Sequence, residues 1–366
     1  MKKSSKKGLS EVITTLIIIG VSLLGITMIW VVIRNVITSG SEEIDIGKFV
    51  VDLDMQKVQV NPNGIDVTVK RNVGQGSLKE ISFVISDGTN TQIFKQPATL
   101  EELGRQTFSI NYSGPIKSIA IAPISSSGSQ GGIADTLEFS GYEAAKNMFG
   151  LVSWWKMEGN ANDEMGLNNG NLSDPAPQLV DGKHGKAYRF FDISNMIKAV
   201  DSQSLQLENS NMTIITWINK TLAGAYAPIV SKGDVRGHAE PGYFVGTTFV
   251  SSTKVKPGFG TSNFSVEPNY NITTKTWNHL AFSQSVISTS RTLRFYDNGQ
   301  LINQTSKSGV NVTSSVGYDL LIGIDNDVNF GAQYESFAGT IDEVMIFNRT
   351  LSAQEVQALY NLDLSN

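Results

Sequence analysis

The strongest candidate for metal-binding chemistry in this sequence is the run from Asp325 to Asn329, which reads DNDVN. Oxygen-bearing side chains at alternate positions suit a calcium ion, so Asp325, Asp327 and Asn329 are candidate calcium ligands. The run departs from the EF-hand pattern at its glycine position, where Phe330 stands, and at its twelfth position, where Ser336 stands. A polar surface loop without metal is the alternative.

Motifs for catalysis are incomplete or missing. Glu43 and Asp45 echo the E-x-D-x-E signature of one family of β-glucanases, but Gly47 stands at the position of the final carboxylate. Retaining glycosidases need two carboxylates about 5–5.5 Å apart. The sequence has no P-loop, dinucleotide fingerprint, G-x-S-x-G or H-E-x-x-H motif. It also has no cysteine, which excludes thiolate zinc sites and cysteine nucleophiles. We therefore expect no catalytic residues and no enzymatic activity.

Aromatic side chains are further candidates for ligand binding. Four tryptophans could stack on sugar rings: Trp154, Trp155, Trp217 and Trp277. Trp217 and Trp277 lie in strand-like runs, so we expect these two to pack in a core, where buried aromatic rings dominate. Three histidines share no metal-ligand spacing, and we expect them to be structural or exposed: His184, His238 and His279.

Nine Asn-x-Ser/Thr sequons offer acceptor sites for N-linked glycans. A chain this rich in Asn, Ser and Thr carries several sequons by chance, and some of these fall in predicted strands, so they permit glycosylation without requiring it. The acceptor residues are Asn111, Asn171, Asn211, Asn219, Asn263, Asn271, Asn303, Asn311 and Asn348.

Composition limits the class of partner. The 366 residues carry a formal net charge of −5, only 17% of them are charged, and the first eight positions hold the one block of basic residues. Because phosphate binding needs clustered Lys and Arg, we do not expect nucleic acid as a partner. The length suits two or three domains, and the 34 glycines suit many short strands joined by turns.

Residues 12–33 form the longest apolar stretch, 22 residues without a charge. As a helix this stretch is long enough to span the hydrocarbon core of a bilayer. Four lysines precede it within the first seven residues, and positive charge stays in the cytoplasm. We therefore expect a single-pass protein of the cell membrane with a cytoplasmic N-terminus and extracellular domains. A cleaved secretory signal, the alternative, has a shorter apolar region of roughly 7–15 residues.

The run from Lys6 to Val12, KKGLSEV, resembles the processing site of archaeal type IV pilins, which carry class III signal peptides. This resemblance implies cleavage by a prepilin peptidase between Gly8 and Leu9, with residues 1–8 as the signal peptide and 9–38 as the pilin-like transmembrane helix. Cleavage would remove four lysines and change the net charge from −5 to −5 − 4 = −9. Glu11 stands at the third mature position, whereas many type IV pilins have Glu at the fifth.

Residues 48–141 show the alternation of strands. A turn at Asn61–Gly64 separates the first two runs. About seven short strands at this spacing predict a small β-sandwich, and similar domains follow the helix in archaeal pilin-like proteins. Residues 142–150 read as a linker. The alternating runs are 58–60, 65–70, 81–85, 107–112, 116–121 and 136–139.

Residues 151–366 resemble laminin-G-like or concanavalin A-like jelly rolls along their whole length. The ordered series of segments carries the resemblance: 151–158 (LVSWWKME), 159–163, 181–187, 212–218 (MTIITWI), 229–233, 277–281, 293–301 (LRFYDNGQL), 321–323, 339–347 (GTIDEVMIF) and 351–360. Two local signals agree with it. Asn298-Gly299 predicts a hairpin turn, and Ser352 with Glu355 predicts a capping box that starts a C-terminal helix.

The jelly-roll resemblance also implies a second group of metal ligands. Laminin-G-like domains often hold a structural calcium ion through acidic residues near their first and last strands. Glu158, Asp163 and Asp342 occupy such positions here, so calcium is the one cofactor that we expect.

These observations predict a mainly β protein with one N-terminal transmembrane helix, a small β-sandwich and a C-terminal jelly roll. The expected function is that of an archaeal surface adhesin or recognition protein, which presents the jelly roll to glycans or other surface proteins. Its other expected partners are membrane lipid along residues 12–33, the prepilin peptidase and further pilin subunits. The alternative is a structural subunit of a pilus-like filament or of the cell envelope, and a third class is a carbohydrate-active enzyme.

Overall fold

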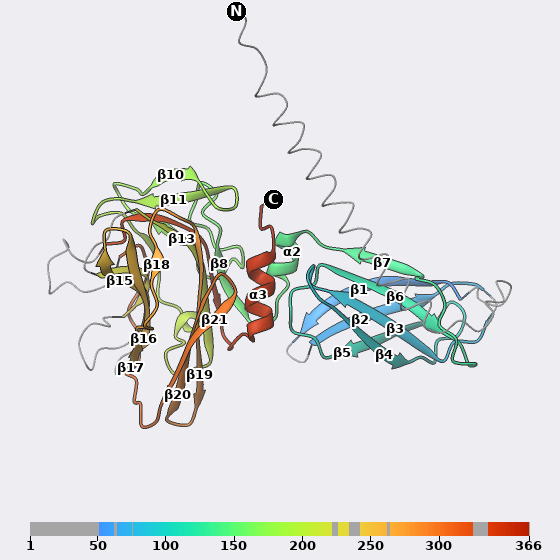
Figure 1. The fold of residues 1–366 in the computed structure, drawn as a ribbon. Coiled ribbons are helices and arrows are strands. Elements are labelled where there is room, and N and C mark those ends of the chain that lie inside the picture. Colours follow the sequence, from blue (N-terminus) through green and yellow to red (C-terminus); the bar gives the residue numbers. More distant parts are fainter. Residues whose placement is uncertain are drawn as a thin grey trace, which may run out of the picture.

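The computed structural model describes residues 51–61, 64–74, 76–221, 226–233, 242–261, 264–324 and 336–365. They form two β-rich domains side by side, with two short helices between them (Figure 1). We call residues 51–139 the N-terminal β-domain and residues 151–365 the C-terminal domain.

Several sequence-based predictions fall outside the described residues. They are the apolar helix at 12–33, the processing site at Gly8 and Leu9, the calcium run from Asp325 to Asn329, and the sequon at Asn263. Within the described ranges, no helix is long and apolar enough to cross a membrane.

The N-terminal β-domain is a sandwich of two antiparallel sheets, ordered β1-β2-β5 and β4-β3-β6-β7. Inward-facing residues such as Val67 and Phe83 are fully buried between the sheets, as the alternation of apolar residues predicts. All six predicted strand runs are confirmed, and β4 is added to them. The strands are β1 (Leu53–Asn61), β2 (Gly64–Arg71), β3 (Glu80–Ser86), β4 (Thr91–Pro97), β5 (Arg105–Ile110), β6 (Ser118–Ile124) and β7 (Asp135–Glu138).

The chain enters this domain at the end farthest from the C-terminal domain. Leu53, at the start of β1, pairs with Arg71 at the end of β2, and the Arg71 N–H donates to the Gly104 carbonyl at 3.0 Å. Residues 51–53, 71–74, 76–79 and 98–105 therefore share one end of the sandwich, which we call the distal end.

The chain leaves the domain at the opposite end, which we call the proximal end. This end holds residues 86–91 and 110–117. After β7 the Phe139 N–H donates to the Lys117 carbonyl at 2.9 Å, and the chain then passes to the C-terminal domain. Asn361 Nδ2 of that domain donates to Thr89 Oγ1 at 3.1 Å, so the proximal end is in direct contact with it.

The predicted linker at 142–150 contains a packed helix, α2 (Gly141–Lys146). Ser140 and Glu143 form a capping box at its N-terminus, which fixes where the helix begins. Ala144, Ala145 and the following Met148 are buried in a core cluster that also contains residues of the C-terminal domain. The connection is therefore part of the hydrophobic core of the C-terminal domain.

The C-terminal domain consists of two antiparallel sheets. The first has the order β10-β11-β23-β13-β19-β20-β21 with β8 beside β23, and the second has the order β17-β16-β15-β14-β22-β12-β9 with β18 beside β16. The strands of the first sheet are β8 (Leu151–Trp155), β10 (Gln178–Asp181), β11 (Lys186–Phe190), β13 (Met212–Lys220), β19 (Asn278–Ile287), β20 (Ser290–Asp297), β21 (Gln300–Lys307) and β23 (Gly339–Phe347). Those of the second are β9 (Gly170–Leu172), β12 (Ile197–Ala199), β14 (Tyr226–Lys232), β15 (Tyr243–Ser251), β16 (Lys254–Thr261), β17 (Phe264–Val266), β18 (Ile272–Thr273) and β22 (Leu320–Ile322). A 3₁₀ helix, η1 (Gln203–Leu205), precedes β13.

Local signals in the C-terminal domain act as the sequence predicts. Asn298 and Gly299 both have positive φ, 48° and 79°, in the turn between β20 and β21. Ser352 and Glu355 form a capping box at the N-terminus of α3 (Ala353–Asn361). Apolar residues between the sheets form the inner core. On the outer face of the first sheet, α2 and α3 cover residues such as Trp154 and Met345.

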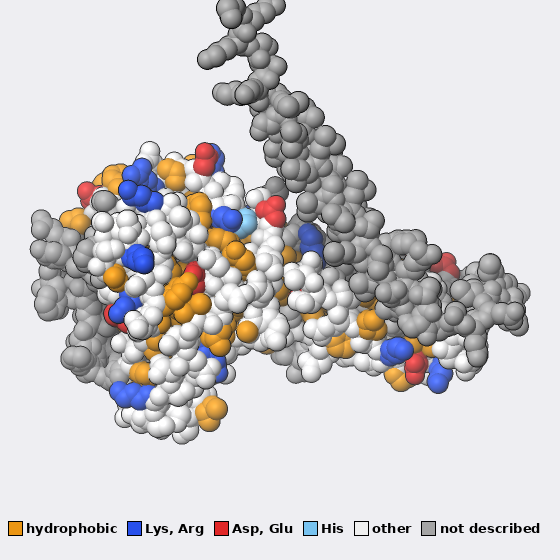
Figure 2. Space-filling view, in the orientation of Figure 1, with side chains coloured by type: hydrophobic (Ala, Val, Ile, Leu, Met, Phe, Trp, Pro, Cys, Tyr) orange, Lys and Arg blue, Asp and Glu red, His pale blue; other side chains and the backbone are white. Residues whose placement is uncertain are grey.

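Charged side chains are sparse on the face drawn in Figure 2, where most of the C-terminal domain surface is uncharged and hydrophobic side chains lie in small groups. This agrees with the low charged fraction of the sequence, 17%.

Candidate functional site

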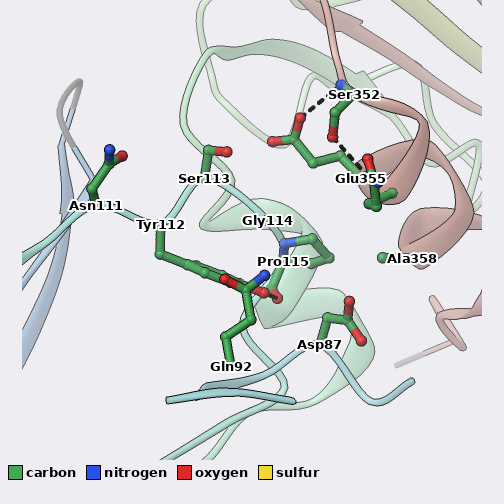
Figure 3. Close-up of a pocket in the computed structure, with 11 residues that line it drawn as sticks. Asp87, Gln92, Asn111, Tyr112, Ser113, Gly114, Pro115, Ser352, Glu355 and Ala358 are labelled. Atoms are coloured by element: carbon green, nitrogen blue, oxygen red, sulfur yellow. Dashed lines mark hydrogen bonds between the residues drawn. The ribbon is translucent and has the colours of Figure 1, made fainter. Parts of the chain in front are cut away.

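A cleft of about 290 Å³ lies where the proximal end of the β-domain meets the start of α3 (Figure 3). Its walls come from both domains, and most of its lining side chains are polar. The β-domain supplies Asp87, Gln92, Asn111, Tyr112, Ser113, Gly114 and Pro115, and the C-terminal domain supplies Ser352, Gln354, Glu355 and Ala358.

The β-domain wall is held by hydrogen bonds within its own loops. Tyr112 is buried and its hydroxyl donates to the Pro115 carbonyl at 2.9 Å. Burial, helped by the nearby carboxylates of Asp87 and Glu355, raises the pKa of Tyr112, so the phenol stays protonated. Asp87 Oδ1 accepts from the Thr89 N–H at 2.7 Å. These contacts fix the shape of the wall before any ligand arrives.

Arg349 joins the α3 wall to the rest of the cleft. Its Nη2 lies 2.8 Å from Glu355 Oε1 and donates to the Ser113 carbonyl at 3.2 Å. Its Nε donates to the Phe149 carbonyl at 2.7 Å. Glu355 also accepts from the Ser352 N–H at 2.8 Å, as the dashed lines in Figure 3 show. One guanidinium thus links the β-domain, the α2 connection and α3.

Three amide side chains line the cleft and are exposed: Gln92, Asn111 and Gln354. None of the three makes a side-chain hydrogen bond that ties it to another described residue. Each amide offers two N–H donors and one carbonyl acceptor. The cleft therefore presents unpaired planar polar groups on fixed walls, an arrangement suited to a small polyhydroxylated ligand.

A second chemical feature lies on the outer face of the first sheet. Asp342 and Glu343 are adjacent on β23 and almost fully buried. Glu343 has a positive φ of 51°, and β23 is bulged there against β13. Asp342 Oδ2 accepts from the N–H groups of Lys183 and His184 at 2.8 and 3.0 Å. The Trp154 Nε1–H donates to Glu343.

Burial perturbs both carboxyl groups of this pair. It raises the pKa of Asp342 to about 7, with the charge of Glu158 adding to the effect. Burial and the neighbouring Asp342 raise the pKa of Glu343 well above its ordinary value. At neutral pH the pair therefore retains a proton that two exposed carboxyls would have lost.

The structure separates the predicted calcium group of Glu158, Asp163 and Asp342. Glu158 Oε1 accepts from the Lys186 N–H at 3.0 Å, so Glu158 and Asp342 hold the same loop. Asp163 lies apart, because its carboxylate caps a different loop. Its donors, at 2.8–3.1 Å, are the backbone N–H groups of Trp154, Met165, Leu167 and Asn168.

Within the described ranges, no three His, Asp or Glu side chains gather in an arrangement that could hold a metal ion. The structure therefore does not bring Glu158, Asp163 and Asp342 together as one ligand group. Calcium remains a prediction for Asp325, Asp327 and Asn329.

The tryptophans have structural positions. Trp154 and Trp155 are fully buried and are not accessible to sugars. Trp217 is 4% exposed and stacks on Tyr360 of α3, with ring centroids 5.6 Å apart. The prediction of core packing is confirmed for Trp217. It is wrong for Trp277, which precedes β19 and is only half-buried.

Two of the three histidines pack against the edge of Trp217. His279 lies 5.0 Å from it between ring centroids, and His184 lies 5.7 Å away. Burial lowers the pKa of His279 to about 3, with His184 adding a smaller repulsion, so His279 is neutral at physiological pH. The structural role predicted for these two is confirmed, and His238 is outside the described residues.

The described sequons differ in access. Six acceptor asparagines are exposed: Asn111, Asn171, Asn211, Asn271, Asn311 and Asn348. Asn219 and Asn303 are half-buried in β13 and β21. The exposed set is sterically open to modification, and Asn111 also lines the cleft.

The family comparison covers the larger part of the C-terminal domain. Residues 194–357 match the family described as the concanavalin A-like lectin/glucanases superfamily. This segment is a concanavalin A-like jelly roll. It contains β13 to β23 and most of α3, and we refer to the C-terminal domain as the jelly roll from here on. The predicted fold of this domain is thereby confirmed. A search of curated proteins finds no match.

Solved structures with low sequence identity also align with this chain. Domain 4 of AbnA, a GH43 extracellular arabinanase from Geobacillus stearothermophilus in complex with arabinotriose, is 18% identical, with 58% of this chain and 98% of that chain covered and a TM-score of 0.43. A native heptameric SAP-like pentraxin from Limulus polyphemus is 14% identical, with 46% and 82% covered and a TM-score of 0.33. The binding domain of botulinum neurotoxin DC in complex with SialylT is 11% identical, with 58% and 51% covered and a TM-score of 0.41.

Sequence reasoning missed the cleft and the acid pair. The cleft joins residues more than 230 positions apart, such as Gln92 and Glu355, and no periodicity reports such a contact. Of the acid pair, only Asp342 was named in the sequence analysis as a candidate site residue. Glu343 was overlooked since strict alternation assigns neighbours to opposite faces of a sheet.

Proposed function

We propose that this chain is a membrane-anchored archaeal surface protein, an adhesin whose jelly roll is displayed outside the cell and binds glycans. The observation that carries the proposal is the concanavalin A-like jelly roll, whose family is described by lectins and glucanases. The apolar stretch at 12–33, preceded by lysines and the pilin-like run around Gly8, supports the anchor.

The interdomain cleft is the glycan site in this proposal. Its volume of about 290 Å³ is at the lower limit for ligand sites, roughly 300–1,000 Å³, which suits one sugar unit at the end of a chain. Gln92, Asn111 and Gln354 offer amide donors and acceptors to sugar hydroxyls. Tyr112 provides an apolar ring edge beneath them.

The two carboxylates in the cleft support binding rather than hydrolysis. Asp87 accepts backbone N–H groups of its own loop, and Glu355 is held by Arg349 and by the helix cap. Both therefore have structural partners, whereas glycoside hydrolysis needs one carboxyl free to donate a proton and a second free to attack or activate water.

A glycan array probed with the full-length chain in detergent tests this function. We expect binding to a limited set of glycans. Gln354→Ala and Gln92→Ala should each weaken that binding about tenfold, the loss expected from roughly 1.4 kcal/mol of hydrogen bonding.

Gln357→Ala is the matched control, because Gln357 lies on the same helix but outside the cleft and bonds to Gln300. It should bind like the parent. An array without signal would refute glycan recognition, whereas binding that is unchanged in both cleft variants would place the glycan elsewhere on the jelly roll.

A further inference from the structure

The distal end of the β-domain is where the chain arrives from its N-terminal segment. Residue 51 follows the predicted apolar stretch, which ends at Ile33, after 17 intervening residues. Such a tether spans at most about 60 Å. The distal end of the β-domain, rather than its proximal end, is therefore tethered close to the predicted anchor.

Two large apolar side chains are exposed at this end. Val73 is 68% exposed and Leu103 is 62% exposed, more than any other large apolar side chain of the described β-domain. Backbone hydrogen bonds hold them beside the chain entry. The Asn72 N–H donates to the Asp52 carbonyl at 2.9 Å, and the Leu103 N–H donates to the Arg71 carbonyl at 2.9 Å.

One buried side chain, Arg71, holds the backbone near both apolar residues. The Arg71 guanidinium is buried and donates to the carbonyls of Leu100 at 3.0 Å and Gly76 at 2.6 Å. It therefore ties both loops to the end of β2. The positions of Val73 and Leu103 are therefore set by hydrogen bonds within the domain.

Leu103 is an unusual residue for a water-facing turn. It has a positive φ of 62°, a region in which glycine and asparagine are favoured over a residue with a bulky side chain. Its turn is closed by the Gly104 N–H, which donates to the Glu101 carbonyl at 3.0 Å. Glycine or asparagine would relieve the strain of this turn, whereas an exposed leucine is unfavourable in water. An apolar partner would therefore favour leucine at this position.

We propose that Val73 and Leu103 contact the lipid surface of the membrane in which residues 12–33 are anchored. This inference rests on the anchoring proposed above. Charged side chains at the distal end have both signs: Asp52, Lys79, Glu101, Glu102 and Arg105. A polybasic attraction to anionic lipid is therefore not the driving force. The contact is apolar and shallow, and the tether supplies the effective concentration that two side chains need.

Because the chain has no cysteine, a single introduced cysteine is a unique labelling site. We would reconstitute full-length Leu103→Cys, labelled with an environment-sensitive fluorophore, into phosphatidylcholine vesicles that contain a doxyl-labelled lipid quencher. We expect quenching of at least twofold and a blue-shifted emission. Ile287→Cys in the jelly roll, at a residue 78% exposed, is the matched control and should remain unquenched.

Vesicle flotation in the same samples separates the contact from the anchor. Protein that floats without quenching at position 103 would overturn the lipid contact and leave the anchor standing, and protein that does not float would overturn both. Quenching that disappears at one chain per vesicle would indicate a second copy in place of lipid and would also overturn the proposal. Adding phosphatidylserine should change the quenching by less than a fifth, since the contact is apolar.

A second variant guards against loss of folding. Leu103→Asn removes the apolar side chain and places a residue that accepts positive φ, so it should melt at the parent's temperature or above it. A fluorophore at Val73→Cys should be quenched in the parent background. In the Leu103→Asn background this quenching should fall by about half, and an unchanged value would count against a joint contact.

Discussion

The β-domain and the jelly roll differ in how much charge they bury. In the described part of the β-domain the only buried charged side chain is Arg71, which donates to loop carbonyls. The jelly roll buries charged or titratable side chains on several of its elements: Lys156, Asp163, His184, Glu208, Lys220, Lys232, His279, Arg291, Asp297, Asp342, Glu343 and Glu355. The stability of a small sandwich with an apolar core should therefore depend less on pH below neutrality than that of a domain with buried carboxyls.

This difference shows where the jelly roll places its buried titratable side chains. The jelly roll is lined by apolar side chains between its sheets, and its buried carboxyls Asp342 and Glu343 lie on the outer face under the two helices. The helices therefore do more than cover a sheet. They exclude water from titratable groups, and the start of α3 forms one wall of the cleft. The β-domain contributes the loops that form the other wall of the cleft.

The largest expected effect comes from the two apolar cores. Trp155→Ala should lower the free energy of unfolding of the jelly roll by about 3–5 kcal/mol, because Trp155 is fully buried between the sheets. Phe83→Ala should do the same to the β-domain, where Phe83 packs on Phe108 at 5.1 Å. Hydrogen exchange with mass spectrometry should locate each loss in its own domain, and a loss shared equally would mean that the domains unfold as one unit.

The pH dependence tests the buried carboxyl of Asp342 directly. Its pKa rises from 3.8 to about 7 on folding, so the folded state holds a proton that the unfolded state loses. The free energy of unfolding therefore falls as pH rises from about 4 to about 7. Asp342→Asn cannot ionise and should be more stable than the parent at pH 8, by on the order of 2–4 kcal/mol, but not at pH 4.

Urea melts at pH 4, 6 and 8 measure this effect. His279, whose pKa is lowered, gives an opposite slope in the parent and the variant alike. That slope cancels in the difference between the two proteins, which therefore reports the carboxyl pair of Asp342 and Glu343. Equal stability at pH 8 would mean that Asp342 is ionised at little cost in the folded protein.

Removing the α2 connection should destabilise the jelly roll by about 3 kcal/mol. A fragment of residues 151–366 loses Ala144, Ala145 and Met148 from the outer core, and burying one large apolar side chain contributes roughly 1.5–3 kcal/mol. A fragment of residues 139–366 keeps them and is the matched control. Differential scanning calorimetry of both fragments is the test. Identical melting temperatures would mean that the connection adds no stability and is a simple linker.

Calcium should stabilise the jelly roll by about 2.7 kcal/mol at a free concentration one hundred times its dissociation constant, if only the folded state binds it. Asp325→Ala should abolish the rise in melting temperature. Asp163→Ala should lower the melting temperature equally with calcium or with chelator, because Asp163 caps backbone N–H groups. A parent protein that melts identically in calcium and chelator would remove the calcium prediction.

The sequence determined the strands and caps well because these depend on local chemistry. Alternation predicted β1 to β3, Asn298-Gly299 predicted the β20–β21 turn, and Ser352 with Glu355 predicted the start of α3. The same capping pattern at Ser140 and Glu143 was present in the sequence and would have revealed α2. It was overlooked because a six-residue helix is too short to display a periodic apolar face.

What the sequence could not predict depends on contacts between distant segments. The cleft requires the loop at 111–115 to meet α3, and the Arg349 guanidinium that joins them has no local signature. The acid pair requires a bulge at Glu343, which turns a regular strand into an irregular one. Asp163 and Asp342 seemed equivalent as acidic residues near the first and last strands, but each caps a different loop.

The entry and exit of the β-domain at opposite ends have a mechanical consequence. In the anchored, glycan-bound state proposed above, tension on the chain would enter at Leu53 and leave at Phe139, along the strand direction. Hydrogen bonds between β1 and β2 would then be sheared together rather than opened one by one like a zipper. The β-domain would thus be loaded in the direction in which its β1–β2 ladder resists stretching best.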